Sequence, residues 1–236
     1  MERGERHIQK IKDFLLDRYK NNLAAILIFG SVNTGQFQEG KSDIDHMIFL
    51  KKLNGLNIDE ELKFLNNKLK QENFASQYFN DLGGLKNYIK KRKSFSTYIV
   101  VVGGDASKIV YTTPEFEKTR DYLKKHPLTK KEIQEFIREK DKFELGGCFE
   151  NIKGYDLSKQ LMFHLRRKLQ VMNYFKTKKL IFDYHICLDN TNIDSEEREE
   201  LEKLYKTYEK REGLSKKEID YYTILAREFT KKIIQF

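Results

Sequence analysis

A short stretch of the chain, residues 27–50, combines residue types that could bind a charged ligand. It reads LIFGSVNTGQFQEGKSDIDHMIFL, and its apolar ends predict two buried strands. Gly30 and Ser31 end the first apolar run, while Asp43 and Asp45 lie at the start of the second. Because residues two apart in a strand point to the same face, the two carboxylates are predicted to lie side by side. Two such charges repel each other unless a cation lies between them.

A hard divalent cation, Mg²⁺ or Mn²⁺, would remove this repulsion, because such ions prefer carboxylate oxygens. Magnesium is commonly held by one or two carboxylates and completes its shell with water and substrate phosphates. The structural alternative is that an Asp-x-Asp sequence caps a strand or pairs with a lysine such as Lys41. The pair alone therefore does not decide between a metal site and a strand cap.

The glycine-serine pair adds a second kind of ligand group. Gly30 at a strand end lets the backbone approach a ligand without a Cβ in the way. The N–H groups of the turn and the hydroxyl of Ser31 can bind phosphate oxygens. A Gly-Ser pair is also an ordinary turn, but here it is predicted to lie beside the carboxylates. Together they predict the two halves of a site for a nucleoside triphosphate and its metal.

This pattern resembles the motif of the nucleotidyltransferase superfamily related to DNA polymerase β. That motif has an apolar residue before Gly-Gly or Gly-Ser, then a loop, then Asp-x-Asp or Asp-x-Glu among apolar residues. In this chain Phe29–Ser31 is followed by eleven residues and then by Asp43–Asp45. Gly35 and Ser42 in the loop are also similar to the family pattern. The second half of the chain looks similar in layout to kanamycin nucleotidyltransferase.

The resemblance implies that Asp43 and Asp45 are catalytic and bind the metal, and that Gly30, Ser31 and Ser42 contact the nucleotide. The implied substrate is a nucleoside triphosphate, most simply ATP. The implied reaction moves its nucleoside monophosphate onto a hydroxyl group of a small-molecule or protein acceptor and releases pyrophosphate. The resemblance does not identify the acceptor.

Active members of the superfamily usually have a third carboxylate on a neighbouring strand, and the matching strand FASQYF contains none. Nearby acids have structural interpretations: Asp81 as a helix cap, Asp105 as a turn residue and Glu72 as a solvated helix residue. His46 is expected to face away from the aspartates, and His164 to be a packing or surface residue. A catalytically weak or inactive nucleotide-binding sensor is therefore the alternative function.

Hydrophobic periodicity predicts the elements that must position these residues. In the first half we expect helices over 5–20, 57–71 and 82–92, strands over 23–29, 44–50 and 74–79, and a hairpin over 95–112. The second half predicts helices over 114–126 and 155–176, and others beginning after Thr129, at Ser195 and after Ser215; LIFDYHICL is ambiguous between strand and helix. The predicted fold class is α+β, with a mixed-sheet nucleotidyltransferase domain at residues 1–113 and an all-α helical bundle at residues 114–236.

The composition is that of a folded, soluble protein. Of the 236 residues, 39% are hydrophobic and 13% are aromatic, which argues against wholesale disorder. No apolar run is long enough to span a bilayer, and the N-terminus has no apolar signal core, so we expect a cytoplasmic protein. The net charge of +9 is compatible with an anionic partner such as a nucleotide or nucleic acid. Template-independent addition of nucleotides to RNA is thus a further alternative, although no aromatic platform among lysines favours it.

The cysteine content predicts thiols rather than disulfides. The chain has two cysteines, Cys148 and Cys187, and we expect both to be buried and reduced. A zinc site that adds His185 is the alternative, but the paired Cys-x-x-Cys spacing typical of zinc is missing.

Overall fold

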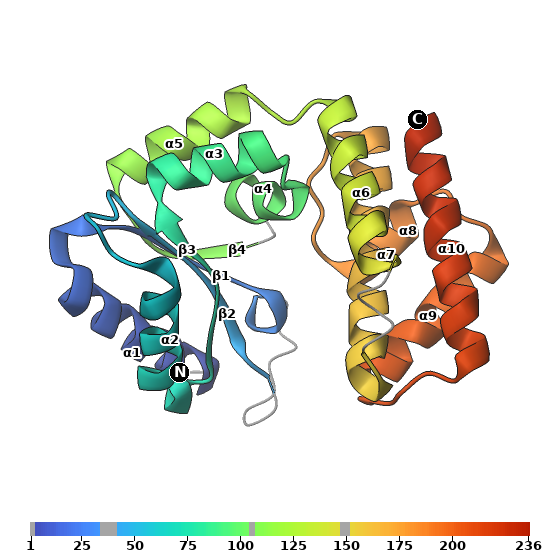
Figure 1. Cartoon of the computed structure of the whole chain (residues 1–236), viewed down its shortest axis with the longest axis horizontal. Helices are drawn as coiled ribbons and strands as arrows, with labels where there is room; N and C mark the ends of the chain where they lie inside the picture. Colours follow the sequence, from blue (N-terminus) through green and yellow to red (C-terminus); the bar gives the residue numbers. More distant parts are fainter. Residues whose placement is uncertain (1–2, 34–41, 104–106, 147–151) are drawn as a thin grey trace. The chain divides into compact units, whose positions relative to one another are not determined.

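The computed structural model describes residues 3–33, 42–103, 107–146 and 152–236 (Figure 1). The chain divides into two compact units, Met1–Pro127 and Leu128–Phe236. This division lies beyond the boundary that the sequence predicted after residue 113. The difference arises because helix α5 (Pro114–Lys125) packs against elements of the first unit.

The first unit is built on a mixed four-stranded sheet. Its order is β3-β2-β1-β4, formed by Phe74–Asp81, Ile44–Leu50, Leu23–Phe29 and Ser107–Thr112. β1 pairs antiparallel with both of its neighbours, whereas β2 and β3 are parallel. β1 is buried along almost its whole length, as its uninterrupted apolar sequence predicted.

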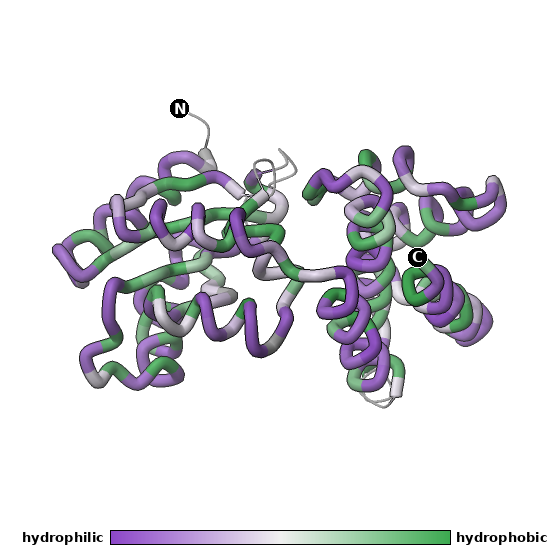
Figure 2. Tube along the Cα trace, turned by 90° about the horizontal axis from the view of Figure 1, so that it is seen from above, coloured by the Kyte–Doolittle hydropathy of each residue, from purple (hydrophilic) through white to green (hydrophobic). Residues whose placement is uncertain are grey.

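Helices cover both faces of this sheet (Figure 1). One face carries α1 (Arg3–Tyr19) and α2 (Ile58–Lys68), whose apolar stripes join the strands in a hydrophobic core. The other face carries α3 (Leu82–Arg92) and α5, and there Phe49 of β2 packs against Phe116 of α5 with ring centres 5.3 Å apart. Figure 2 shows hydrophilic and hydrophobic residues mixed along the coils of the helices. Successive side chains of β2 point to opposite faces of the sheet, so they pack alternately against the two helical layers.

The predicted hairpin over residues 95–112 is wrong in its first half. Residues Phe95–Val102 form helix α4, and only the second half is a strand, β4. The side chain of Ser94 caps this helix by accepting from the N–H of Thr97. Seven of its eight residues are buried, so tertiary packing outweighs the strand preference of its β-branched residues. Such an apolar run does not by itself distinguish a buried helix from a buried strand.

The described residues of the second unit contain helices and no strand. They are α6 (Lys130–Glu144), α7 (Gly154–Thr177), α8 (Tyr184–Asn190), α9 (Ser195–Glu209) and α10 (Lys216–Gln235). The helices predicted to begin after Thr129 and Ser215 do so, each with a capping box at that residue, and a third capping box begins α9 at Asp194. The ambiguous segment LIFDYHICL becomes helical at Tyr184. Across the described ranges, no helix is both long and apolar enough to cross a membrane.

Candidate active site

Gly30 directly follows β1 and begins a single 3₁₀ turn, Gly30–Val32. Its φ of +77° lies in the left-handed region that favours glycine. A Cβ on Gly30 would also stand only 2.6 Å from Oδ2 of Asp45. The backbone conformation therefore favours glycine, and any side chain at this position would displace the carboxylate of Asp45, which lies directly against the turn.

The sheet brings this carboxylate to the end of β1. Phe29 pairs with Asp45 on β2 and with Ser107 on β4, and Asp45 pairs with Ala75 on β3. These four residues form one row across the sheet, which we call the Asp45 row. Asp45 is half-buried within it.

Asp43 directly precedes β2, which spans Ile44–Leu50 as the sequence predicted. Exposure still alternates as expected: Asp43 is exposed, Ile44 is fully buried and Asp45 is half-buried. The N–H of Ile44 donates to the carbonyl of Asn73 at 2.7 Å, which fixes the start of β2 beside β3. Ser42 is half-buried directly before Asp43.

The donor set of this site suits a small divalent cation. Two carboxylates one residue apart, next to a turn without a side chain, match the oxygen ligands that Mg²⁺ takes from proteins when phosphates and water complete its shell. Among the described residues, no group of three or more histidine, cysteine, aspartate or glutamate side chains could hold a metal ion by itself. The site therefore fits a metal that is shared with a phosphate-bearing substrate.

Neither described candidate for a third carboxylate joins the pair. Asp81 pairs with Leu50 at the far end of β2, about 20 Å along the strand from Ala75. There it caps α3 by accepting from the N–H of Gly84 at 2.6 Å, as the sequence predicted. Glu72 lies at the correct end of the sheet, but it is paired with α1 through His7 at 2.6 Å and Lys10 at 2.8 Å.

The position beside Asp45 on the neighbouring strand is occupied by Ala75. Partners in a parallel pair point to the same face, so Ala75 is where an acid could reach a ligand of Asp45. Lys41 and Asp105, considered from the sequence, lie outside the described residues.

His46 faces away from the aspartates, as predicted. It is completely buried and stacks on Phe74 of β3 with ring centres 4.8 Å apart. Burial lowers the pKa of His46 to about 3, so the ring is neutral at physiological pH. It is therefore a core residue and not a base of this site.

The second unit contains a buried ionic cluster that the sequence did not reveal. His164 on α7 lies between two acids of α6: its Nε2 is 2.8 Å from Asp141, and its Nδ1 contacts Glu144. Arg167 donates to Glu144 at 2.9 Å, and the fully buried Lys168 donates to Asp141 and, at 2.8 Å, to a carbonyl of α10. The cluster thus links three helices, and its members satisfy one another.

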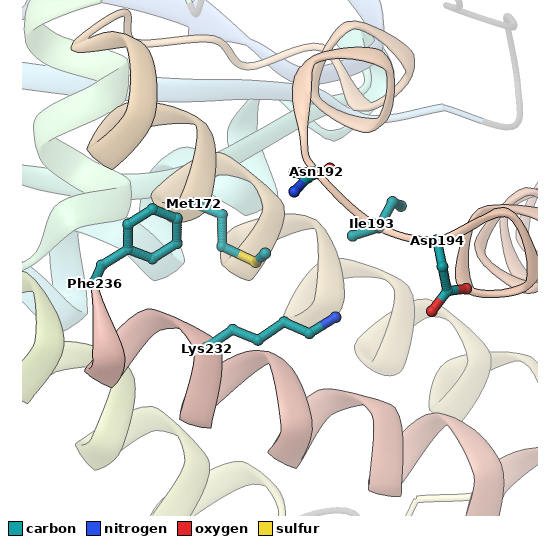
Figure 3. Close-up of a pocket in the computed structure, with 6 residues that line it drawn as sticks. All are labelled: Met172, Asn192, Ile193, Asp194, Lys232 and Phe236. Atoms are coloured by element: carbon teal, nitrogen blue, oxygen red, sulfur yellow. The ribbon is translucent and has the colours of Figure 1, made fainter.

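A pocket of about 520 Å³ in the second unit offers no comparable chemistry (Figure 3). Figure 3 shows Met172 and Phe236 near one end and Lys232 extending along it toward Ile193 and Asp194. Lys232 is already paired with Glu197 at 2.7 Å.

Elsewhere in the same unit Cys187 is a free, fully buried thiol, whereas Cys148 lies outside the described residues.

Comparisons with known proteins agree with the geometry of the first unit. A nucleotidyltransferase domain matches residues 8–166, more than half of the chain. The fold is similar to that of spectinomycin adenyltransferase from Enterococcus faecialis, solved with ATP and spectinomycin, with a TM-score of 0.61 over 97% of this chain and 98% of that chain. The two sequences are 13% identical, so this likeness concerns the fold, and a comparison with curated proteins gives no match. The chain belongs to the nucleotidyltransferase domain family, as its motif predicted, and is an enzyme of the nucleotidyltransferase class.

Proposed function

We propose that this enzyme is metal-dependent and transfers AMP from ATP to a hydroxyl group of a small-molecule or protein acceptor. The observation that carries the proposal is the contact between the Gly30 turn and the carboxylate of Asp45. This contact places the backbone of Gly30, which can approach phosphate groups, next to a carboxylate that can bind their metal ion. Asp43, exposed immediately before β2, supplies the second carboxylate.

In this proposal Asp43 and Asp45 hold Mg²⁺ or Mn²⁺. When bound, such an ion neutralises charge on the phosphates and lowers the pKa of the acceptor hydroxyl. The turn at Gly30 and Ser31 binds phosphate oxygens through its N–H groups and the serine hydroxyl, and Ser42 donates to the same nucleotide. These contacts orient the α-phosphate toward the acceptor, and such positioning accounts for much of catalysis in phosphoryl transfer.

The test follows label from α-labelled ATP into acceptors with the full-length enzyme. The double variant Asp43→Asn/Asp45→Asn should abolish transfer, because amides bind a hard cation far more weakly than carboxylates. The matched control is Asp17→Asn/Asp220→Asn, which removes the same charge from two exposed helical positions. Transfer at the normal rate by the first variant would reject the assignment of these residues.

A nucleotide sensor with little or no turnover is the second candidate function, and Ala75 supports it because β3 carries no acid beside Asp45. Calorimetry with ATP and Mg²⁺, combined with assays for pyrophosphate release over a panel of acceptors, separates the two. Binding without release would favour the sensor. RNA as the acceptor is a weaker alternative, which would require an affinity for RNA that falls steeply with salt.

A further inference from the structure

Arg166 on α7 is a cation with no acidic partner among the described residues. It has no hydrogen bond or ion pair to any described residue, whereas the adjacent Arg167 is paired with Glu144. Its guanidinium carbon lies 4.8 Å from the ring centre of Phe163 and 4.7 Å from that of Phe182. Two aromatic rings therefore flank the guanidinium, and its five N–H donors meet no acceptor in the described part of the chain.

The surroundings of Arg166 partly remove water from the guanidinium, so its charge is destabilised when no acid pairs with it. Burial lowers the pKa of Arg166 from its usual value, and the groups that raise it are phenols and a thiol, not carboxylates. Phe182 is buried and is held by Gln170, whose Nε2 donates to its carbonyl at 3.2 Å. The side chain is nevertheless only half-buried, so an incoming group can reach it. A partly desolvated guanidinium of this kind gains strongly from an oxyanion.

An aromatic surface continues outward from this pair of rings. Tyr208 of α9 contacts Phe163 at 5.7 Å and stacks on Tyr155 at 6.1 Å with an angle of 18° between the rings. Tyr205, one turn earlier on α9, lies 6.0 Å from Tyr208 but is buried and stacks on Tyr184 at 4.8 Å, so the accessible part of this surface ends at Tyr208. Flat apolar surfaces next to an unsatisfied cation are complementary to a planar ring that carries a negative group.

We propose that the second unit binds a small aromatic molecule bearing a phosphate or carboxylate, and that Arg166 is the residue that binds its oxyanion. Cation–π contacts explain why Arg166 lies against Phe163 and Phe182, but they do not use the N–H donors of its guanidinium. An oxyanion in the plane of the fork would fill them, with the rings of Phe163 and Tyr208 against the rest of the ligand. If this ligand is the acceptor of the transferred nucleotide, that role rests on the proposed function; the binding itself does not.

The test is calorimetry on the full chain without nucleotide or metal, using phenyl phosphate and benzoate as probes. At least one should bind, and which one binds identifies the oxyanion. Arg166→Met should weaken that binding at least tenfold, and Arg166→Lys should weaken it less, because lysine keeps the charge without the planar fork. Arg138→Met, at an exposed arginine of α6, is the matched control and should bind like the unchanged protein.

Two further measurements keep the inference falsifiable. The melting temperature of unliganded Arg166→Met should be equal to or above that of the unchanged protein, because a partly buried, unpaired cation has been removed. A lowered melting temperature, together with failure of the unchanged protein to bind either probe, would show that Arg166 serves packing alone. The variant Asp43→Asn/Asp45→Asn should bind the probe normally, so loss of nucleotidyl transfer and loss of this site are distinguishable.

Discussion

The carboxylate of Asp45 occupies the space that a side chain at Gly30 would need. Its Oδ2 is 2.6 Å from the position of a Cβ on Gly30, whose φ is +77°. The end of β1 and the start of β2 are thus fitted to each other at the site of the proposed chemistry. A substitution at Gly30 must displace either the turn or the acid.

Gly30→Ala should therefore impair both stability and nucleotide binding. We expect a loss of about 1–3 kcal/mol in the free energy of unfolding, from backbone strain and the displaced carboxylate. Denaturant unfolding measures the first effect, and calorimetric titration with ATP and Mg²⁺ measures the second.

Gly55→Ala is the matched control, because Gly55 has a φ of +82° but nothing within 4 Å of its Cβ position. It carries the same backbone strain without the contact to Asp45. If both variants bind ATP equally well, the close approach of Gly30 and Asp45 is irrelevant to the nucleotide.

Ala75→Glu should increase activity, because it puts an acid beside Asp45 in the Asp45 row. An additional carboxylate should tighten Mg²⁺ binding about tenfold, since ligand charge tunes affinity for hard cations. Ala75→Gln has nearly the same size without the charge and should show no gain. Equal Mg²⁺ affinity and equal transfer rates in the two variants would refute this role for the position.

Replacing His46 should stabilise the protein in acid. Burial lowers the pKa of His46 from its ordinary value of 6.5 to about 3, so its contribution to stability is complete above pH 6.5 and is lost as the pH falls toward 3. His46→Leu should remove about 3 kcal/mol of the decline between pH 7 and pH 4. Nucleotidyl transfer at pH 7 should be unchanged, and a large loss of activity would indicate that His46 has a role in the site.

Glu144 should be the acid-sensitive member of the cluster on α6 and α7. Burial alone would raise the pKa of Glu144, but its hydrogen bond with His164 and the positive charge of Arg167 lower it to about 2. The stability that this carboxylate contributes is complete above its ordinary pKa of 4.5 and is lost as the pH falls through 2. Glu144→Gln should cost about 3–5 kcal/mol at pH 7, because it leaves the half-buried guanidinium of Arg167 without its carboxylate.

Urea unfolding at pH 7 and pH 3 checks this prediction, and the difference between the two proteins should shrink at the lower pH. Glu139→Gln, an exposed position on the same helix, is the control and should behave normally. An equal cost at both pH values would mean that Glu144 acts through packing instead of charge.

Local sequence signals predicted much of the first unit and of its candidate site. The apolar runs on either side of the motif from Phe29 to Asp45 predict two neighbouring strands. Pairing of these strands brings the glycine turn next to Asp45. Residues 95–102 could not be assigned correctly, since an apolar run of this length fits either a buried helix or a strand.

The sequence also could not predict the cluster around Glu144 and His164, or that Arg166 has no acidic partner among the described residues. Their partners lie on different helices, and nothing in the spacing of ordinary charged residues indicates which will be buried together. Packing of whole elements, not local pattern, determines such contacts.

The Asp45 row also has a genetic consequence. An alanine codon becomes an aspartate or glutamate codon through one base change, and Ala75 on β3 already pairs with Asp45 on β2. No insertion, new loop or altered strand pairing is needed for that exchange in either direction. Within a lineage of such proteins, an active transferase and a protein that only binds nucleotides can therefore differ by a single substitution.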